Sequence, residues 1–220
     1  MAFKVAVTSN RLVDDVVLGV LNGAGLDVVR RPCETEDSVI EAARDADGLL
    51  VHLLPLTPRR VLEALPKLKV VSRHGVGVDS IDLDAATELG ICVCNTPGMN
   101  TTEVADHAMA LLLSVTRGIP ALNDALKKGW WSENYEGLSE QRARLTRIAG
   151  NTVGIIGLGN IGRAFAMRAR GFGPARIIAS DPYVPQTVGD LYGVQIVDLD
   201  TLLAESDFIS VHTPSNEETY

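Results

Sequence analysis

Residues 153–165 read VGIIGLGNIGRAF, an apolar run that is followed by three closely spaced glycines and then by a helix-forming stretch. This spacing is typical of a turn that holds a pyrophosphate. Gly157 would permit the tight turn off a strand, Gly159 would let a ligand approach the backbone, and Gly162 would let the helix pack close to the strand. The N–H groups at the start of the helix would add partial positive charge.

The residues after the helix complete this pattern. ARIIAS (175–180) reads as the next strand, and Asp181 follows it directly. A carboxylate at this point can accept both hydroxyls of an adenosine ribose, and its charge repels a 2′-phosphate. The pattern therefore predicts a site for NAD rather than NADP. The alternative interpretation is an acidic turn residue before Pro182.

Composition limits the classes of function. The chain has 220 residues and a net charge of −8, and 46% of its residues are hydrophobic. An acidic protein is not attracted to nucleic acid or to an anionic membrane, and no apolar run approaches the roughly 20 residues of a membrane span. The first residues, MAFKVAVTSN, predict a strand rather than a signal peptide. We expect a cytoplasmic protein without nucleic-acid or membrane partners.

The three cysteines are expected to be buried structural thiols, as is common in the cytoplasm. Cys92 and Cys94 alternate on a predicted strand, so their side chains should share one face. No second pair is present to complete a zinc site, and we predict no metal site.

The first half of the chain alternates short apolar runs with helix-like segments. Continuous apolar strands separated by helices indicate a parallel sheet covered on both faces, here of the flavodoxin-like, doubly wound type. The expected strands are 4–9, 26–30, 48–53, 69–75 and 91–97, and the expected helices are 11–24, 37–46, 58–65 and 82–90.

A long helix is predicted over residues 100–118 and would join the two halves. Asn100 and Glu103 have the spacing of a capping box, and Gly118 with Pro120 would end the helix. The polar stretch 128–150 is expected to form a loop and a helix. Its arginines, Arg142, Arg144 and Arg147, either face an anion or lie on a solvated surface.

The second half has the pattern of a Rossmann fold that is only partly built. Strands are expected at 151–157, 175–180, 194–197 and 207–214, with helices at 161–173 and 199–205. A complete dinucleotide fold has about six strands, so the last strand would present an unpaired edge. We predict an N-terminal substrate-binding domain over 1–99 and an NAD-binding domain, truncated, over 100–220.

Five segments, in this order, resemble the D-isomer-specific 2-hydroxyacid dehydrogenase family, one branch of which contains D-3-phosphoglycerate dehydrogenase. The segments are SRHGVGVDSID (72–82), GICVCNTPGMNTTEVADHAMALLL (90–113), VGIIGLGNIGR (153–163), SDPY (180–183) and HTPSNEET (212–219), and the resemblance extends over nearly the whole chain.

The resemblance implies roles for particular residues. The backbone N–H groups of Val76 and Gly77 would hold the substrate carboxylate, with Asn100 at the substrate end of the site; a tight turn and a helix cap are the alternative interpretations. Arg73 is an open candidate for contact with an acidic substrate. The expected NAD-binding residues are Val76, Gly157, Gly159, Asn160, Ile161, Gly162, Asp181, Thr213 and Pro214.

The resemblance also implies a reaction, the transfer of hydride from the CH–OH group of a D-2-hydroxy acid to NAD. The family uses an Arg, a Glu and a His that all follow the HTP segment, and none of the histidines in this sequence matches the catalytic one. We therefore expect a fragment or a degenerate relative, inactive as it stands, with its catalytic residues beyond Tyr220. The alternative is a non-catalytic, NAD-responsive binding protein, like the corepressors of the same family. The family also implies a homodimer.

Overall fold

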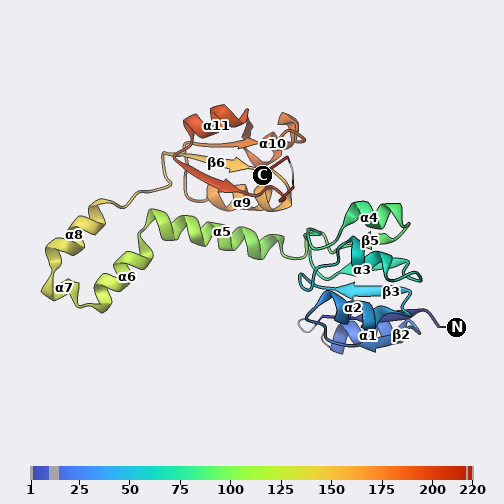
Figure 1. Ribbon diagram of the computed structural model, residues 1–220. Coiled ribbons are helices and arrows are strands. Elements are labelled where there is room, and N and C mark those ends of the chain that lie inside the picture. Colours follow the sequence, from blue (N-terminus) through green and yellow to red (C-terminus); the bar gives the residue numbers. More distant parts are fainter. Residues whose placement is uncertain (1, 10–14, 217, 220) are drawn as a thin grey trace. The chain divides into compact units, whose positions relative to one another are not determined.

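The computed structural model describes residues 2–9, 15–216 and 218–219. The chain divides into two compact units, residues 1–99 and residues 100–220 (Figure 1). Each unit is built on a parallel sheet that has helices on both faces, which confirms the predicted α/β class. Each unit also has an apolar core of its own.

The first unit contains a five-stranded sheet in the order β2-β1-β3-β4-β5, and all neighbouring strands are parallel. This is the strand order of flavodoxin-like folds. Leu49 and Val71, in the central strands, are buried, as expected for a parallel sheet that is covered on both sides. The strands are β1 (Lys4–Val7), β2 (Asp27–Arg30), β3 (Gly48–Val51), β4 (Val70–Arg73) and β5 (Cys92–Cys94).

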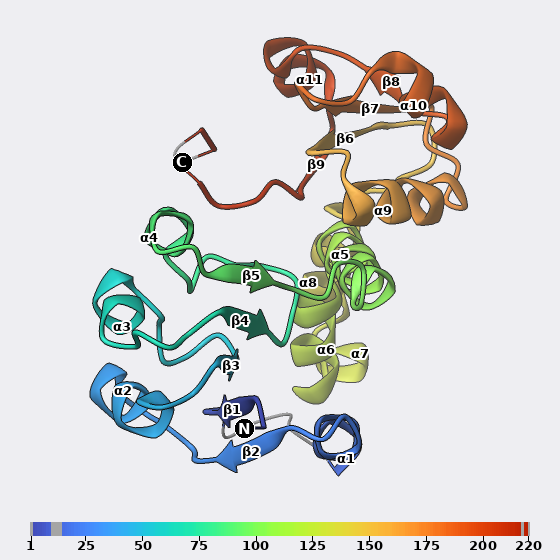
Figure 2. The same ribbon diagram turned by 90° about the vertical axis from the view of Figure 1, so that its right-hand side faces the viewer.

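Three helices cover one face of this sheet, namely α2 (Glu36–Ala43), α3 (Arg59–Glu63) and α4 (Leu83–Glu88), and α1 (Asp15–Gly23) lies on the opposite face (Figure 2). Local capping explains where two of them begin. The Thr35 hydroxyl accepts a hydrogen bond from the Ser38 N–H before α2, and the Asp82 carboxylate accepts one from the Ala85 N–H before α4. Residues 11–14 of the first predicted helix lie outside the described residues.

The second unit contains a four-stranded parallel sheet in the order β8-β7-β6-β9, which is the order of the first four strands of a Rossmann fold. Helix α9 packs on β6 together with α5, and α11 lies on the other side of the sheet (Figure 1). The elements are α5 (Thr101–Thr116), β6 (Thr152–Ile156), α9 (Asn160–Arg170), β7 (Arg176–Ser180), α10 (Gln186–Tyr192), β8 (Gln195–Ile196), α11 (Leu199–Glu205) and β9 (Phe208–Val211).

The capping box predicted at the start of α5 is wrong. The Asn100 side chain caps no backbone N–H, and its Oδ1 is buried without a hydrogen-bond partner among the described residues. At the other end, Gly118 has a φ of 58° and turns the chain into a further helix, with Pro120 in its first turn. This further helix is α6 (Ile119–Lys127). The polar stretch 128–150 that follows is helical in part, with α7 (Trp130–Glu133) and α8 (Tyr135–Ala143).

The prediction of buried cysteines is right for Cys33 and wrong for Cys92 and Cys94, which are exposed. The physical reason is the position of β5 at the sheet edge. In the described structure, the apolar cluster under α1 draws on β1, β2 and β3 and not on β5. The two sulfur atoms lie 3.9 Å apart, which confirms that their side chains share one face.

No helix in the described part of the chain combines the length and the apolar character that a membrane span requires.

Candidate functional site

The first position of the turn, Gly157, can accommodate only a residue without a side chain. Gly157 follows β6 with a φ of 89°, in the left-handed region that disfavours other residues. A Cβ at this position would lie 2.9 Å from the carbonyl carbon of His212 and 3.0 Å from Cγ2 of Thr213. The turn therefore packs directly against the segment that follows β9, and the structure brings Gly157 and Thr213 together.

The other two glycines have different surroundings. A Cβ at Gly162 would overlap with the carbonyl oxygen of Gly157, so this glycine lets α9 pack onto the turn. A Cβ at Gly159 would meet no atom within 4 Å. Gly159 is exposed, and its position at the N-cap of α9 has no side-chain cap. The first N–H groups of a helix lack partners within the helix, so those of Asn160 and Ile161 open onto this space. The cradle fits an anionic diphosphate.

Asp181 lies beside the same turn. One carboxylate oxygen accepts a hydrogen bond from the Leu158 N–H at 2.8 Å, and the other accepts one from the Tyr183 N–H at 2.9 Å. An ionised carboxylate has about four acceptor positions, so capacity remains for two hydroxyl donors. Arg163 Nε donates to the Leu158 carbonyl at 2.9 Å, which adds a second hydrogen bond to the same residue of the turn. Sequence reasoning missed this arginine, because nothing in the glycine pattern specifies it.

The HTP segment completes this group of residues. Thr213 and Pro214 follow β9, and the Thr219 hydroxyl donates to the Pro214 carbonyl at 2.5 Å. The segment thus lies at the carboxyl end of β9, as the glycine turn does at β6 and Asp181 at β7. Ligands of open α/β sheets bind at this edge.

A second set of predicted residues belongs to the first unit. Val76 and Gly77 lie in the turn after β4, and Asn95 Nδ2 donates to the Val76 carbonyl at 2.7 Å. Gly75 has a φ of 146°, and a Cβ there would overlap with the Arg73 guanidinium. Arg73 Nη1 donates to the His74 carbonyl at 3.0 Å, and its Nε is buried without a partner in the described structure.

The turn at residues 75–77 therefore combines glycine backbone with an adjacent cation, and both favour an anion. The sequence signal for Arg73 is its position two residues before Gly75, the first glycine of the turn. Asn100 belongs to the second unit, and its partnerless Oδ1 is available as a hydrogen-bond acceptor.

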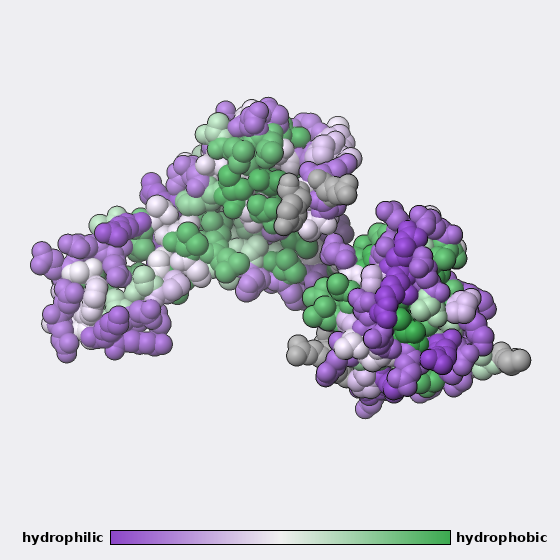
Figure 3. Space-filling model, viewed as in Figure 1, coloured by the Kyte–Doolittle hydropathy of each residue, from purple (hydrophilic) through white to green (hydrophobic). Residues whose placement is uncertain are grey.

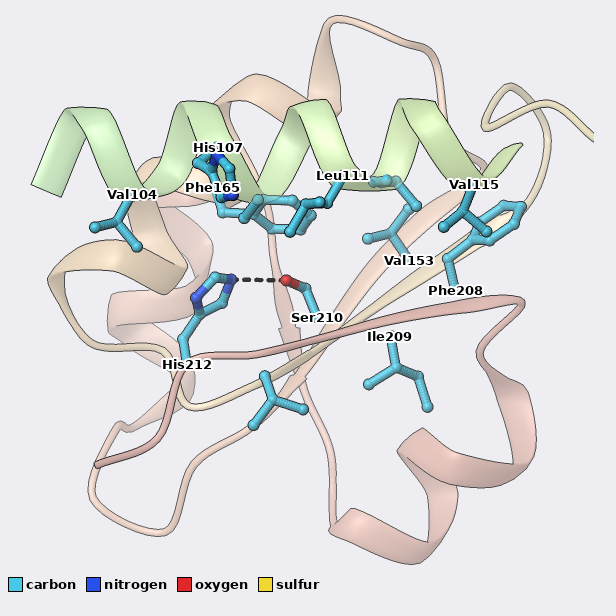
Figure 4. Close-up of a pocket in the computed structure, with 13 residues that line it drawn as sticks. Val104, His107, Leu111, Val115, Val153, Phe165, Phe208, Ile209, Ser210 and His212 are labelled. Carbon is cyan, nitrogen blue, oxygen red and sulfur yellow. Dashed lines mark hydrogen bonds between the residues drawn. The ribbon is translucent and has the colours of Figure 1, made fainter. Parts of the chain in front are cut away.

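A groove of about 600 Å³ runs along β9, the edge strand of the second sheet (Figure 4). Its lining is mainly apolar, with Val104, Leu111 and Val115 from α5 and Ile209 from β9. On the face seen in Figure 3, hydrophobic residues gather over this unit. The sequence predicted an unpaired edge at β9, and β9 does lie at the edge of the described sheet.

His212 lies in this groove. Its Nε2 is hydrogen bonded to the Ser210 hydroxyl at 2.9 Å, and its ring centroid is 5.3 Å from that of Phe165. Burial lowers the pKa of His212 below its ordinary value. His107, from α5, lines the same groove (Figure 4).

Arg142, Arg144 and Arg147 are exposed, which favours the solvated surface over the anion site. Among the residues that the structure describes, no group of three or more His, Cys, Asp or Glu side chains could hold a metal ion.

The comparison with family models matches residues 5–215 to the catalytic domain of the D-isomer specific 2-hydroxyacid dehydrogenases. The chain belongs to this family.

Relatives within the 2-hydroxyacid dehydrogenase family include D-3-phosphoglycerate dehydrogenase of Mycobacterium bovis, which is 44% identical over 184 residues. That alignment covers 83% of this chain and 33% of the relative. Glyoxylate reductase of Thermococcus litoralis is 40% identical over 182 residues, with 83% of this chain and 55% of the relative covered. The chain thus spans about a third to a half of the length of these relatives.

Solved structures of the family have the same fold. D-lactate dehydrogenase from Aquifex aeolicus, crystallised with NAD and lactic acid, has a TM-score of 0.82 and 26% identity, and the match covers 99% of this chain and 62% of that one. The relatives and the solved structure named here are dehydrogenases and a reductase.

Proposed function

We propose that residues 1–220 provide the NAD site and the substrate-carboxylate site of an NAD-dependent dehydrogenase that acts on the CH–OH group of a D-2-hydroxy acid. One observation carries the proposal: the Asp181 carboxylate is hydrogen bonded to the turn whose glycines leave an open cradle at the start of α9. The D-lactate dehydrogenase of A. aeolicus, which has the same fold, was crystallised with NAD.

Each part of the cofactor would have its own partner. The N–H groups of Gly159, Asn160 and Ile161 would bind the pyrophosphate, and Asp181 would accept the hydroxyls of the adenosine ribose. Thr213 and Pro214 would line the space around that ribose. The charge of Asp181 would disfavour the 2′-phosphate of NADP. When bound, NAD would accept the hydride from the carbon that bears the hydroxyl.

The substrate would be held by the first unit. The N–H groups of Val76 and Gly77 would bind its carboxylate, and Val76 would also lie near the cofactor. Arg73 would add a positive charge beside this turn, which favours an anion. Asn100 would accept a hydrogen bond at the substrate end of the site.

The residues that transfer the proton and polarise the oxo group would be contributed by polypeptide other than residues 1–220. The family places its Arg, Glu and His after the HTP segment. The second sheet is compatible with this placement. In a complete Rossmann fold the fifth and sixth strands continue the sheet beside the fourth strand, which is β9 here, and the apolar groove lies along β9. The 220-residue chain alone would bind NAD without oxidising a hydroxy acid.

Calorimetric titration of the chain with NAD and with NADP tests both parts of the proposal. We expect one NAD per chain, weaker binding of NADP, and about 2.7 kcal/mol of stabilisation at 100 times the dissociation constant. Failure to bind NAD would overturn the cofactor assignment. Rapid formation of NADH from a 2-hydroxy acid by this chain would overturn only the placement of the catalytic residues.

A homodimer in the cytoplasm is the final part of the proposal. Helices α6 to α8 expose large apolar side chains, including Leu126, Trp131 and Tyr135, as an interface between subunits would require. The free cysteines are compatible with a reducing compartment. Sedimentation of the chain and of Trp131→Asp tests the dimer, which the variant should weaken. The relatives named above are dehydrogenases and reductases, so no observation favours a corepressor-like role.

A further inference from the structure

Two of the three thiols form a pair on the edge strand of the first unit. Cys92 and Cys94 are exposed on β5, and their sulfur atoms lie 3.9 Å apart. Cys33 differs in every respect. It is buried, it donates to the Arg31 and Ser38 carbonyls at 3.1 and 3.2 Å, and burial raises the pKa of its thiol. A buried thiol of this kind is inert, whereas the pair is accessible to reagents.

The geometry of the pair suits a bridging ion better than a disulfide. Alternate residues of a strand have Cα atoms about 6.6 Å apart, close to the upper limit of about 6.8 Å for disulfides. The sulfur atoms would also have to approach from 3.9 Å to about 2.05 Å. By contrast, a separation of 3.9 Å subtends an angle of about 116° at an ion bound through two bonds of about 2.3 Å. An ion of that size needs no movement of the strand.

The surroundings select among ions. In the described structure no third His, Cys, Asp or Glu joins the pair, so the four protein ligands of a structural zinc site are not present. The neighbours in register on β4 are Val70 and Ser72. These conditions favour a strongly thiophilic ion that is satisfied by two sulfur ligands.

We propose that Cys92 and Cys94 form a two-thiol site for a soft, thiophilic ion of the class of trivalent arsenic and monovalent copper. With an aryl arsenic oxide, two S–H bonds and the arsenic–oxygen bond break and two As–S bonds form. The two protons and the oxygen leave as one water molecule. With monovalent copper, the two protons are released and two Cu–S bonds form. Neither reaction changes an oxidation state.

Phenylarsine oxide and the reduced 220-residue chain test the site. We expect one equivalent to block two thiols from a chromogenic disulfide reagent, to add one phenylarsenic group to the mass with loss of two hydrogens, and to be released by a dithiol but not by a monothiol. Cys92→Ser and Cys94→Ser should each weaken binding by about 100-fold or more, because the second attachment is lost. Both positions are exposed, so both variants should fold, and circular dichroism checks this.

Cys33→Ala is the matched control, because it removes the third thiol and leaves the pair intact. It should bind phenylarsine oxide as the unchanged chain does. Equal binding by the unchanged chain and either serine variant would overturn the proposal, as would blockage of a single thiol. A parallel arm offers monovalent copper without oxygen, in competition with a chromogenic chelator. Copper retained only by chains with both cysteines supports the copper part of the proposal, and copper retained by none of the chains overturns that part.

Discussion

Asp181 and Leu158 are joined by a 2.8 Å hydrogen bond from the Leu158 N–H to the carboxylate, which ties the end of β7 to the glycine turn after β6. The same carboxylate also accepts the Tyr183 N–H. Asp181 therefore shapes the turn before any ligand arrives, and its carboxylate keeps acceptor capacity for the hydroxyls of the proposed ribose. Preorganisation of this kind lowers the cost of binding.

Asp181→Asn removes the charge and keeps the shape of the side chain. We expect the dissociation constant for NAD to rise by about 10- to 100-fold, since a hydrogen bond to a charged group contributes about 1.5–3 kcal/mol. The preference for NAD over NADP should also decrease, because the 2′-phosphate is no longer repelled. Titration with both nucleotides measures the two effects. Asp190→Asn makes the same charge change on the exposed face of α10 and should leave both constants unaltered. An unchanged preference in Asp181→Asn would contradict the ribose assignment.

Two alanine variants distinguish an effect on the free energy of unfolding from an effect on NAD affinity, namely Gly162→Ala and Gly159→Ala. A Cβ at residue 162 would overlap with the Gly157 carbonyl, and we expect Gly162→Ala to lose about 1–3 kcal/mol of unfolding free energy through overpacking. A Cβ at residue 159 meets open space, so that variant should keep the stability of the unchanged chain while losing affinity for NAD. Denaturant unfolding and NAD titration on both variants provide the comparison. Full NAD affinity in Gly159→Ala would show that the diphosphate lies elsewhere.

His212 should make the second unit sensitive to acid. Burial lowers its pKa in the folded state, so the unfolded chain takes up the proton first as pH falls below about 6.5. The free energy of unfolding should therefore decrease below that pH and level off beneath the pKa of the folded state. Urea unfolding at pH 7.5 and 5.5 measures the decrease, which should be smaller in His212→Gln. His107→Gln, at an exposed position, should behave as the unchanged chain. An equal decrease in all three chains would exclude His212 as the cause.

The two cores should unfold separately. Phe165 is fully buried in the core of the second unit, and Leu49 is buried in the core of the first. Phe165→Ala should cost about 3–5 kcal/mol and Leu49→Ala about 2–5 kcal/mol, each lowering one calorimetric transition and leaving the other in place. NAD should raise only the transition that Phe165→Ala lowers. A single transition that responds to both substitutions would contradict independent cores.

Much of the fold could be predicted because its signals are local. Buried parallel strands such as β6 are continuous apolar runs. The glycine turn requires a positive φ at residue 157, and the glycine at that position indicates it. The exposure of Cys92 and Cys94 could not be predicted, because the sequence of a strand does not show whether a helix packs over it. That depends on the tertiary structure. The failure of Asn100 to cap α5 has a similar cause. A cap depends on backbone angles, and the sequence pattern specifies only the residue type.

The candidate site was predicted less completely than the fold. Its glycines and Asp181 have fixed spacing, so they could be named from the sequence. Arg163, which donates to the Leu158 carbonyl, and the groove along β9 arise from contacts between distant elements. Such contacts leave no periodic signal in the chain.

The cores are also separated along the sequence, and this affects synthesis. Every residue of the first core lies between Ala6 and Ile91, before the first residue of the second core at Ala105. A ribosome that adds about 5–20 residues per second needs roughly 6 to 24 s to continue from residue 100 to Tyr220. The first unit thus has all of its core-forming residues available during translation of the second, and it can fold on the nascent chain before the glycine turn has been made.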